Sequence, residues 1–254
     1  MFFQRLLGLA LLCASPFLMA EDCEYSEWGR DDQIGAANRI TPERTIAAAS
    51  LVKTGASHPL GIIITPGMPA YPPRYTQLQV VQPEHQYRTD ASHKLGWKIS
   101  ANDDLVQMWL GTGPQIDGLG HLGEDGEFYN CHQGKDFAAI TGLTKLDISQ
   151  IPPMVARGVL IDVAKHFGVS HLSAAQPIST QDLQGAMKEQ DITVREGDVI
   201  LLHTGYTDAF LEADPQLWGS TIPGITNDAA RFLASLKPLA VGADTWGLGA
   251  VPPA

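Results

Sequence analysis

The residues with the most chemical potential lie in one glycine-rich stretch, residues 111–123, which holds five glycines in thirteen positions. Glycine lets the backbone approach other groups closely, and the stretch also offers an amide, a carboxylate and an imidazole at Gln115, Asp117 and His121. Because Asp117 and His121 are four residues apart, a helical turn would place them on one face, and a tight loop could also bring them together. Such donors suit Zn²⁺ or Mn²⁺. An ordinary hydrogen-bonded turn is the other interpretation, and the sequence alone leaves both open.

Two further titratable residues come at the ends of predicted strands. His203 follows the apolar run 199–202, and Asp244 follows a second short run at 239–242. Functional side chains are often carried where a loop leaves a rigid scaffold, so His203 is a candidate for contacting a substrate. For Asp244, a capping or turn role is an equal alternative.

The elements that would position these residues follow from caps, chain breakers and apolar patterns. Thr41 and Pro42 supply an N-cap and a first-turn proline, which predicts a helix through residue 52. The other predicted elements are a loop at 28–38, strands at 60–65, 78–81, 105–110, 158–163, 199–202 and 239–242, and helices at 179–187 and 227–235. The second half thus alternates strand and helix, which favours a mixed α/β fold.

The composition describes an ordinary globular protein of 254 residues, 44% of them hydrophobic. It carries 17 basic and 28 acidic residues, a formal net charge of −11, and no basic stripe. We therefore expect no nucleic acid and no anionic membrane surface as a main partner. Its 25 glycines and 17 prolines argue against a helical bundle. No linker-like segment divides residues 21–254, which we expect to form a single domain.

Residues 1–20 are expected to be a secretory signal peptide. Arg5 precedes an apolar run at 6–14, and Ala20 provides a small-residue exit. A bilayer span needs about 20 apolar residues, so this run is too short, although an uncleaved anchor is the alternative. We expect a secreted or periplasmic protein without stable membrane insertion. Export would leave two cysteines, Cys23 and Cys131, either joined in a disulfide or as free buried thiols.

The glycine-rich stretch resembles the signature of the cyclase family of metal-dependent hydrolases, which includes bacterial kynurenine formamidase and isatin hydrolase. The family motif His-x-Gly-Thr-His-x-Asp-x-x-x-His places its glycine on Gly113, its aspartate on Asp117 and its last histidine on His121. Further blocks that look like the family's lie at 28–38, 60–69, 157–162, 197–206 and 242–246. The resemblance therefore covers almost all of the expected mature chain, and it implies a swivelling β/β/α domain and a homo-oligomer.

The chain departs from the family motif at several positions. Gly111 stands where the family has its first metal-binding histidine, and glycine offers no ligand atom. Gln115 stands at the second histidine, where a neutral amide oxygen would bind a cation less strongly than imidazole, and Pro114 replaces the threonine. The family's C-terminal histidine and glutamate have no counterpart before Ala254, so we expect either a fragment or a protein without those donors. The metal ligands would then be Asp117, His121 and Gln115, the minimum of three for zinc.

By resemblance, the reaction is hydrolysis of a small amide, either an N-formyl aromatic compound such as N-formylkynurenine or a cyclic amide. A Zn²⁺ or Mn²⁺ ion would polarise the carbonyl and lower the pKa of a bound water to about 7. His121 would be a ligand or the general base, and Asp117 a ligand or the group that orients His121. Aromatic substrates could stack on Trp28, Tyr71 or Trp109, although ordinary core is the more common role for such a ring.

A second hypothesis is a catalytically impaired member of the family that binds a small molecule after export. The glycine at 111, the glutamine at 115 and the missing C-terminal donors motivate this alternative.

Overall fold

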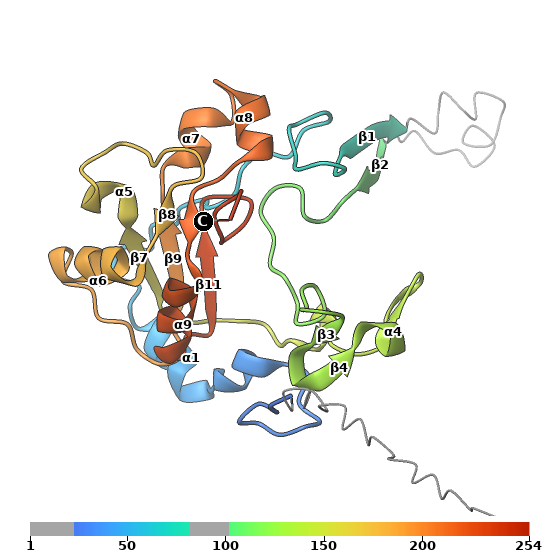
Figure 1. The fold of residues 1–254 in the computed structure, drawn as a ribbon, viewed down its shortest axis with the longest axis horizontal. Coiled ribbons are helices and arrows are strands. Elements are labelled where there is room, and N and C mark those ends of the chain that lie inside the picture. Colours follow the sequence, from blue (N-terminus) through green and yellow to red (C-terminus); the bar gives the residue numbers. More distant parts are fainter. Residues whose placement is uncertain (1–22, 82–101, 254) are drawn as a thin grey trace, which may run out of the picture.

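The computed structural model describes residues 23–81 and 102–253, so the predicted signal peptide lies outside the described residues. A three-stranded parallel sheet forms the centre of the molecule's main body, in the order β11-β9-β7 (Figure 1). Its strands are β7 (Gly158–Asp162), β9 (Val199–His203) and β11 (Ala240–Ala243). All three strands were predicted to within one residue. Because they run parallel, their carboxyl ends meet at one edge of the sheet.

Helices cover one face of this sheet and enclose the main core. They are α5 (Val163–His166), α6 (Thr180–Glu189) and α9 (Asn227–Ser235). Ser179 and Asp182 form a reciprocal capping box that fixes the start of α6. The core residues of this layer are fully or nearly fully buried: Ile161, Val163, Leu172, Ile178, Leu183, Ala186, Ile200, Leu202, Ala229 and Leu233. The fold is therefore mixed α/β, as the alternating pattern predicted.

The other face of the sheet is less covered than expected. The apolar run 159–161 predicts a strand buried on both faces, yet burial alternates along β7, and Leu160 is 58% exposed. Alternation is the signature of a strand with one buried face, because successive side chains point to opposite sides. The prediction for Leu160 was wrong.

The N-terminal part lies along one end of the main body. The helix α1 (Pro42–Ala49) starts where it was predicted, because the Thr41 hydroxyl accepts a hydrogen bond from the Arg44 amide and Pro42 occupies the first turn. It ends three residues before residue 52. The segment predicted as a loop contains a 3₁₀ helix, η1 (Gly35–Arg39), which the sequence did not indicate.

A two-stranded antiparallel hairpin, β1 (Thr76–Val81) and β2 (Asp103–Met108), extends away from the main body (Figure 1). Both strands lie close to the predicted positions at 78–81 and 105–110. The predicted strand at 60–65 is absent: those residues are mostly exposed and have no regular structure. Its β-branched run favours an extended chain, but a strand also needs a partner to share its hydrogen bonds, and no described segment supplies one.

Short elements between residues 127 and 150 form a separate small lobe. They are β3 (Glu127–Phe128), η2 (Tyr129–Cys131), β4 (His132–Gln133), α4 (Gly134–Phe137), β5 (Ala138–Ala139), β6 (Gly142–Leu143) and η3 (Ile148–Gln150). Phe128 and Phe137 pack edge to face at 5.2 Å between ring centroids.

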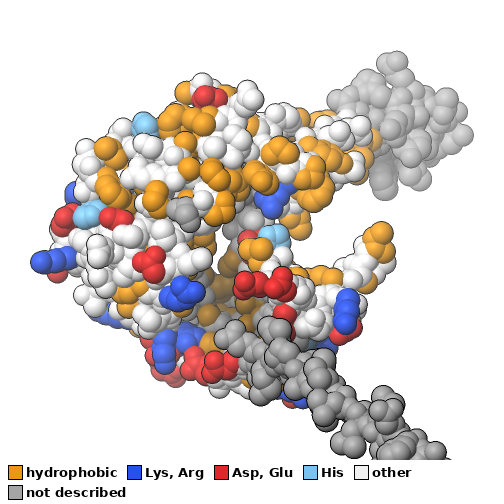
Figure 2. Space-filling model, in the orientation of Figure 1, with side chains coloured by type: hydrophobic (Ala, Val, Ile, Leu, Met, Phe, Trp, Pro, Cys, Tyr) orange, Lys and Arg blue, Asp and Glu red, His pale blue; other side chains and the backbone are white. Residues whose placement is uncertain are grey.

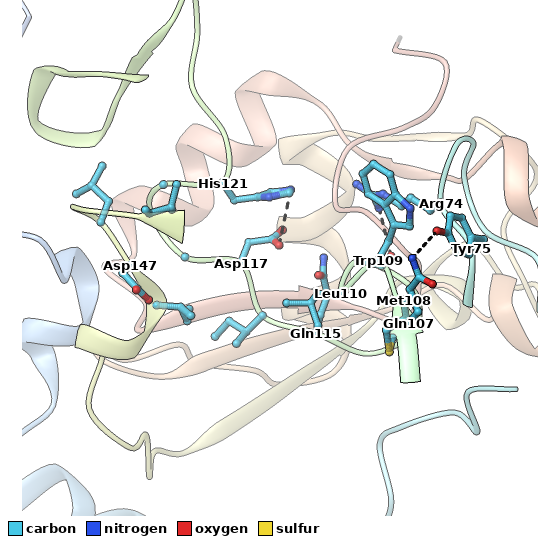
Figure 3. Close-up of a pocket in the computed structure, with 17 residues that line it drawn as sticks. Arg74, Tyr75, Gln107, Met108, Trp109, Leu110, Gln115, Asp117, His121 and Asp147 are labelled. Carbon is cyan, nitrogen blue, oxygen red and sulfur yellow. Dashed lines mark hydrogen bonds and ion pairs between the residues drawn. The ribbon is translucent and has the colours of Figure 1, made fainter. Parts of the chain in front are cut away.

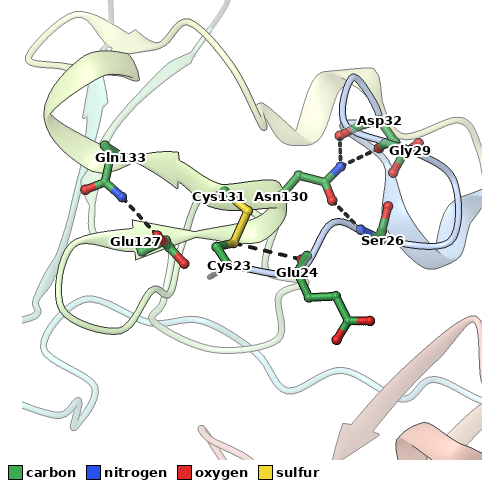
Figure 4. The surroundings of a disulfide bond; sticks show 9 residues. All are labelled: Cys23, Glu24, Ser26, Gly29, Asp32, Glu127, Asn130, Cys131 and Gln133. Carbon is green, nitrogen blue, oxygen red and sulfur yellow. Dashed lines mark hydrogen bonds between the residues drawn. A yellow bond between two sulfur atoms is a disulfide. The ribbon is translucent and has the colours of Figure 1, made fainter. Parts of the chain in front are cut away.

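The N-terminal segment is fastened to this lobe by covalent and polar contacts (Figure 4). Cys23 and Cys131 form a disulfide, with 5.7 Å between their Cα atoms. Beside it, the Asn130 side chain accepts a hydrogen bond from the Ser26 amide and donates to the carbonyls of Gly29 and Asp32. Two segments about a hundred residues apart are thereby held as one unit.

Asp32 adds a second fastening between the same two segments. Burial raises the pKa of its carboxyl, but hydrogen bonds from the Tyr129 hydroxyl, the Asn38 amide and the Gly35 backbone outweigh burial and lower it. Burial, together with the bond to Asp32, raises the pKa of Tyr129 to about 12. Asp32 therefore has a structural role: its hydrogen bonds hold the N-terminal segment against the small lobe.

A second core lies beside the carboxyl ends of the strands, formed by Tyr206, Trp218 and Ile222. Tyr206 and Trp218 come from α7 (Tyr206–Phe210) and α8 (Pro215–Ser220), and Ile222 follows α8. The short parallel pair β8 (Pro177–Ile178) and β10 (Gly224–Ile225) packs against the main core instead, through Ile178 and Ile225. Within the described residues, the structure contains no helix with the length and apolarity that a bilayer span requires.

Candidate active site

The glycine-rich stretch forms a loop between β2 and β3 and contains no helix. A turn closes it, in which the His121 amide donates to the Gly118 carbonyl at 3.0 Å. The loop brings the two titratable side chains together: His121 Nε2 lies 3.7 Å from Asp117 Oδ1 (Figure 3). Both side chains are nearly half exposed, at 44% and 45%. Of the two geometries that the spacing allowed, the structure therefore has the loop.

These side chains line an open cavity of about 850 Å³. Figure 2 shows the molecule hollowed between the hairpin and the small lobe, where this cavity lies. Gln115 also lines it, so the three predicted donors share one space. Its walls are largely apolar and come from three parts of the chain; they include Met108, Trp109, Leu110, Ile116, Leu143, Leu146 and Ile148. A cavity of this size and lining suits a small organic molecule.

Of the aromatic candidates, Trp109 is the one that lines this cavity. The Arg39 guanidinium instead lies over the Trp28 ring, with 4.5 Å between Arg39 Cζ and the ring centroid. Tyr71 packs against Trp246 with 5.0 Å between ring centroids. The structure therefore does not bring Trp28 and Tyr71 to the Asp117–His121 pair, because each ring already has a different partner.

His203 belongs to a separate cluster at the carboxyl edge of the sheet, and it is not among the residues that line the cavity. Its Nδ1 lies 2.9 Å from Asp162 Oδ1, and its Nε2 lies 4.0 Å from Asp244 Oδ2. The Asp244 carboxylate is occupied by hydrogen bonds from the Thr204 amide and hydroxyl and the Gly205 amide. The capping alternative for Asp244 is therefore the one that the structure has.

The charge of this cluster favours a protonated imidazole. Burial lowers the pKa of His203, but the hydrogen bond to Asp162 and the charges of Asp244, Asp162 and Asp208 outweigh burial and raise it. Burial raises the pKa of Asp162, and the bonds from His203 and the Lys165 amide outweigh it and lower that pKa. Asp162 and Asp244 therefore favour the charged form of the His203 imidazole, and His203 lies outside the residues that line the Asp117–His121 cavity.

The resemblance implies a metal, and the donors present test whether one fits. Zinc needs at least three protein ligands, and the loop offers one carboxylate, one imidazole and the weaker amide of Gln115. Across residues 23–81 and 102–253, the one group of three His, Cys, Asp or Glu side chains close enough to share an ion is Cys23, Glu127 and Cys131, where the sulfurs are bonded to each other. The described donors do not complete a site for tightly held Zn²⁺ or Mn²⁺.

A positively charged side chain, Arg74, lines the same cavity as these donors. The Arg74 guanidinium lies against Gly111, with Nη1 donating to the Gly111 carbonyl at 3.2 Å, and Arg74 lines the same cavity as Asp117. Sequence reasoning missed Arg74 because 37 residues separate it from Gly111, and no spacing motif links them.

The chain therefore combines a mixed α/β fold with an imidazole–carboxylate pair that faces a largely apolar cavity. The family described as "Putative cyclase" matches residues 57–250. The chain belongs to this cyclase family.

Solved structures agree with this assignment. A crystal structure of a novel cyclase is 31% identical, with a TM-score of 0.78 over 88% of this chain and 77% of that chain. Isatin hydrolase A from Ralstonia solanacearum is 18% identical, with a TM-score of 0.54 over 83% and 74% of the two chains, which shows a similar fold. Among curated proteins, no sequence matches the chain significantly.

Proposed function

We propose that this protein hydrolyses small amide-type compounds that carry an aromatic ring, with His121 and Asp117 as the acting pair. The observation that carries the proposal is the 3.7 Å approach of the two side chains in a loop that faces a cavity, in a member of the cyclase family. An imidazole titrates near neutral pH, so it can accept a proton from water and later release it.

The reaction can be written with the residues of this chain alone. Water attacks the amide carbonyl while the His121 imidazole takes its proton, and Asp117 stabilises the imidazolium that forms. The C–N bond then breaks, and the proton passes from His121 to the leaving nitrogen, which gives a carboxylic acid and an amine. Gln115 can donate its amide N–H to the carbonyl oxygen as charge develops there. The described donors do not fit a metal ion, and the steps above use none.

The cavity supports an aromatic amide as the substrate class. Trp109 supplies a flat apolar face, and about 850 Å³ accommodates a substituted benzene ring with a formamide or lactam group. N-formylkynurenine, other N-formyl aromatic amines and cyclic amides such as isatin are therefore the compounds to test.

A specific observation also favours a second function, that of a small-molecule binder. The His121–Asp117 pair is nearly half exposed and its atoms lie beyond hydrogen-bonding distance, so water competes for both side chains. A binder would use the same cavity and would show affinity without turnover.

Three broader properties belong to the proposal. We propose export to an oxidising compartment, which the disulfide between Cys23 and Cys131 supports. We also propose the swivelling β/β/α arrangement for the complete fold, supported by the cyclase structure of similar fold. A homo-oligomer is the third, supported by the exposed apolar face of the β1–β2 hairpin.

The test is a panel assay on the full chain, with N-formylkynurenine, isatin and simple lactones as substrates. We expect turnover of at least one amide and a loss of about a hundredfold or more in kcat for His121→Asn. The matched control is His58→Asn, an exposed histidine outside the cavity. If the wild type binds these compounds saturably but does not turn them over, the hydrolase proposal is wrong and the small-molecule binder is supported.

A further inference from the structure

We infer that Arg74 makes one end of the cavity a carboxylate-binding subsite, so that the preferred ligands are aromatic carboxylates. This inference deepens the proposed function by naming a substrate class, although the binding itself needs no turnover. Arg74 and Gly111 are distant in sequence and lie against each other.

The backbone at Gly111 leaves room that the guanidinium occupies. A Cβ atom added at Gly111 would lie 2.8 Å from Arg74 Nη1 and 2.9 Å from Arg74 Cζ, closer than real Cβ contacts. Only glycine at this position therefore accommodates the guanidinium where it lies. The Gly111 carbonyl then fixes Nη1 by a hydrogen bond of 3.2 Å. The missing Cβ atom and the Gly111 carbonyl thus favour this position of the guanidinium.

The rest of the guanidinium remains available for a ligand. Arg74 is half-buried, and its one hydrogen bond to a described residue uses Nη1. Arginine carries five N–H donors in a planar fork that matches the two oxygens of a carboxylate. A partly desolvated cation gains most from an anion that arrives with the ligand, because water no longer solvates it fully.

The cavity's own carboxylates are placed away from that end. Figure 3 shows Arg74 and Trp109 at one end of the pocket and Asp147 at the other. Asp147 caps η3 by accepting the Ser149 amide at 2.8 Å, and Asp117 is paired with His121. The ion pairs among the described residues include none between Arg74 and either aspartate.

The ends of the cavity therefore differ in charge, and this difference indicates which chemical groups a ligand would place at each end. Its carboxylate would lie on the Arg74 guanidinium, its ring against Trp109, and its amide toward Asp117 and His121. An N-acylated aromatic amine with a ring carboxylate, such as 2-formamidobenzoate, has these three groups. A neutral amide of the same size lacks the first contact.

The test compares benzoate with benzamide as probes of the full-length protein, by isothermal titration calorimetry. We expect benzoate to bind about tenfold or more tightly than benzamide, since a charge-assisted hydrogen bond is typically stronger than a neutral one. Arg74→Gln should remove that preference by weakening benzoate alone, and Arg74→Lys should keep part of it. The matched control is Arg231→Gln, an exposed arginine on α9 outside the cavity.

A second variant keeps the inference testable if Arg74→Gln does not fold. Gly111→Ala leaves the charge in the chain but displaces the guanidinium, so it should also weaken benzoate and spare benzamide. Equal affinity of the wild type for benzoate and benzamide would overturn the inference, and so would benzoate binding unchanged in Arg74→Gln and Gly111→Ala. Acetate bound as tightly as benzoate would overturn the aromatic part.

Kinetics separate this inference from the proposed function. If 2-formamidobenzoate is turned over, Arg74→Gln should raise its KM about tenfold with a smaller change in kcat, whereas His121→Asn should lower kcat. If no substrate is turned over but benzoate binding depends on Arg74, the proposed hydrolase function is wrong and the carboxylate-binding subsite is confirmed.

Discussion

His203 Nδ1 lies 2.9 Å from Asp162 Oδ1, so the ends of two adjacent parallel strands, β9 and β7, are joined by an ion pair. The raised pKa of His203 means that the folded state binds its proton more tightly than the unfolded chain does. The pair therefore stabilises the fold fully below the ordinary histidine value of 6.5, and its contribution is lost as pH rises through the folded pKa. Asp162 sets the acid limit: its contribution is lost as pH falls through a folded pKa below 3.8.

We therefore predict that His203→Gln lowers the free energy of unfolding more at pH 5.5 than at pH 9. Since the imidazole is only partly buried, solvent screening limits the difference to about 1 kcal/mol or less. Urea denaturation at the two pH values measures it, with His58→Gln as an exposed control. A loss that is the same at both pH values would show that the imidazole acts by packing rather than by charge.

The disulfide gives a second prediction. Cys23 and Cys131 are 108 residues apart, and closing so long a loop restricts the unfolded chain. The double variant Cys23→Ser with Cys131→Ser should lose about 3–5 kcal/mol in unfolding free energy. Thermal or denaturant melting measures this loss, and a reducing agent should lower the wild-type melting temperature while leaving the double variant unchanged. A wild type insensitive to reductant would contradict a stabilising bond.

The sequence predicted those parts of the fold that local signals determine. The helix at 227–235 has its predicted bounds, and the central strands lie where short apolar runs meet turns. The strand expected at 60–65 failed because pairing depends on a partner elsewhere in the chain. Leu160 was misjudged for a related reason, since an apolar run does not show which face another layer covers.

The candidate site was predictable where its residues share one motif. Asp117 and His121 are four residues apart in a flexible loop, so their approach could be expected. Arg74 could not be found this way, because its contact with Gly111 depends on the antiparallel pairing of β1 with β2 just beyond these two residues. The aromatic rings of Trp28 and Tyr71 suit a substrate ring by their chemistry alone, and the fold gives each ring a different partner.

The incomplete donor set predicts weak metal retention. After incubation with excess Zn²⁺ or Mn²⁺ and desalting, the full chain should retain less than about a tenth of an equivalent, because Asp117 and His121 alone do not supply three strong ligands. Elemental analysis measures the retained metal. Retention of a full equivalent that Asp117→Ala abolishes, and that Asp147→Ala preserves, would show that this pair does belong to a metal site.

The hairpin formed by β1 and β2 predicts self-association of the chain. Leu78 and Val80 share one face of β1, and Val106 lies opposite Leu78 in the register, so the three form an apolar patch. Each is at least 41% exposed. A two-stranded hairpin is only marginally stable in water, and covering this patch by a second copy would stabilise it.

We expect the full chain to sediment as a dimer or larger assembly in analytical ultracentrifugation. Replacing Val80 and Val106 by threonine keeps the β-branched shape but adds hydroxyls to the patch. The dissociation constant of the assembly should therefore rise by about tenfold or more. Leu105→Thr is the matched control, because Leu105 is equally accessible but pairs with Gln79 on the opposite face. A wild type that sediments as a monomer at micromolar concentration would exclude the assembly, and equal effects of both substitutions would place the contact elsewhere.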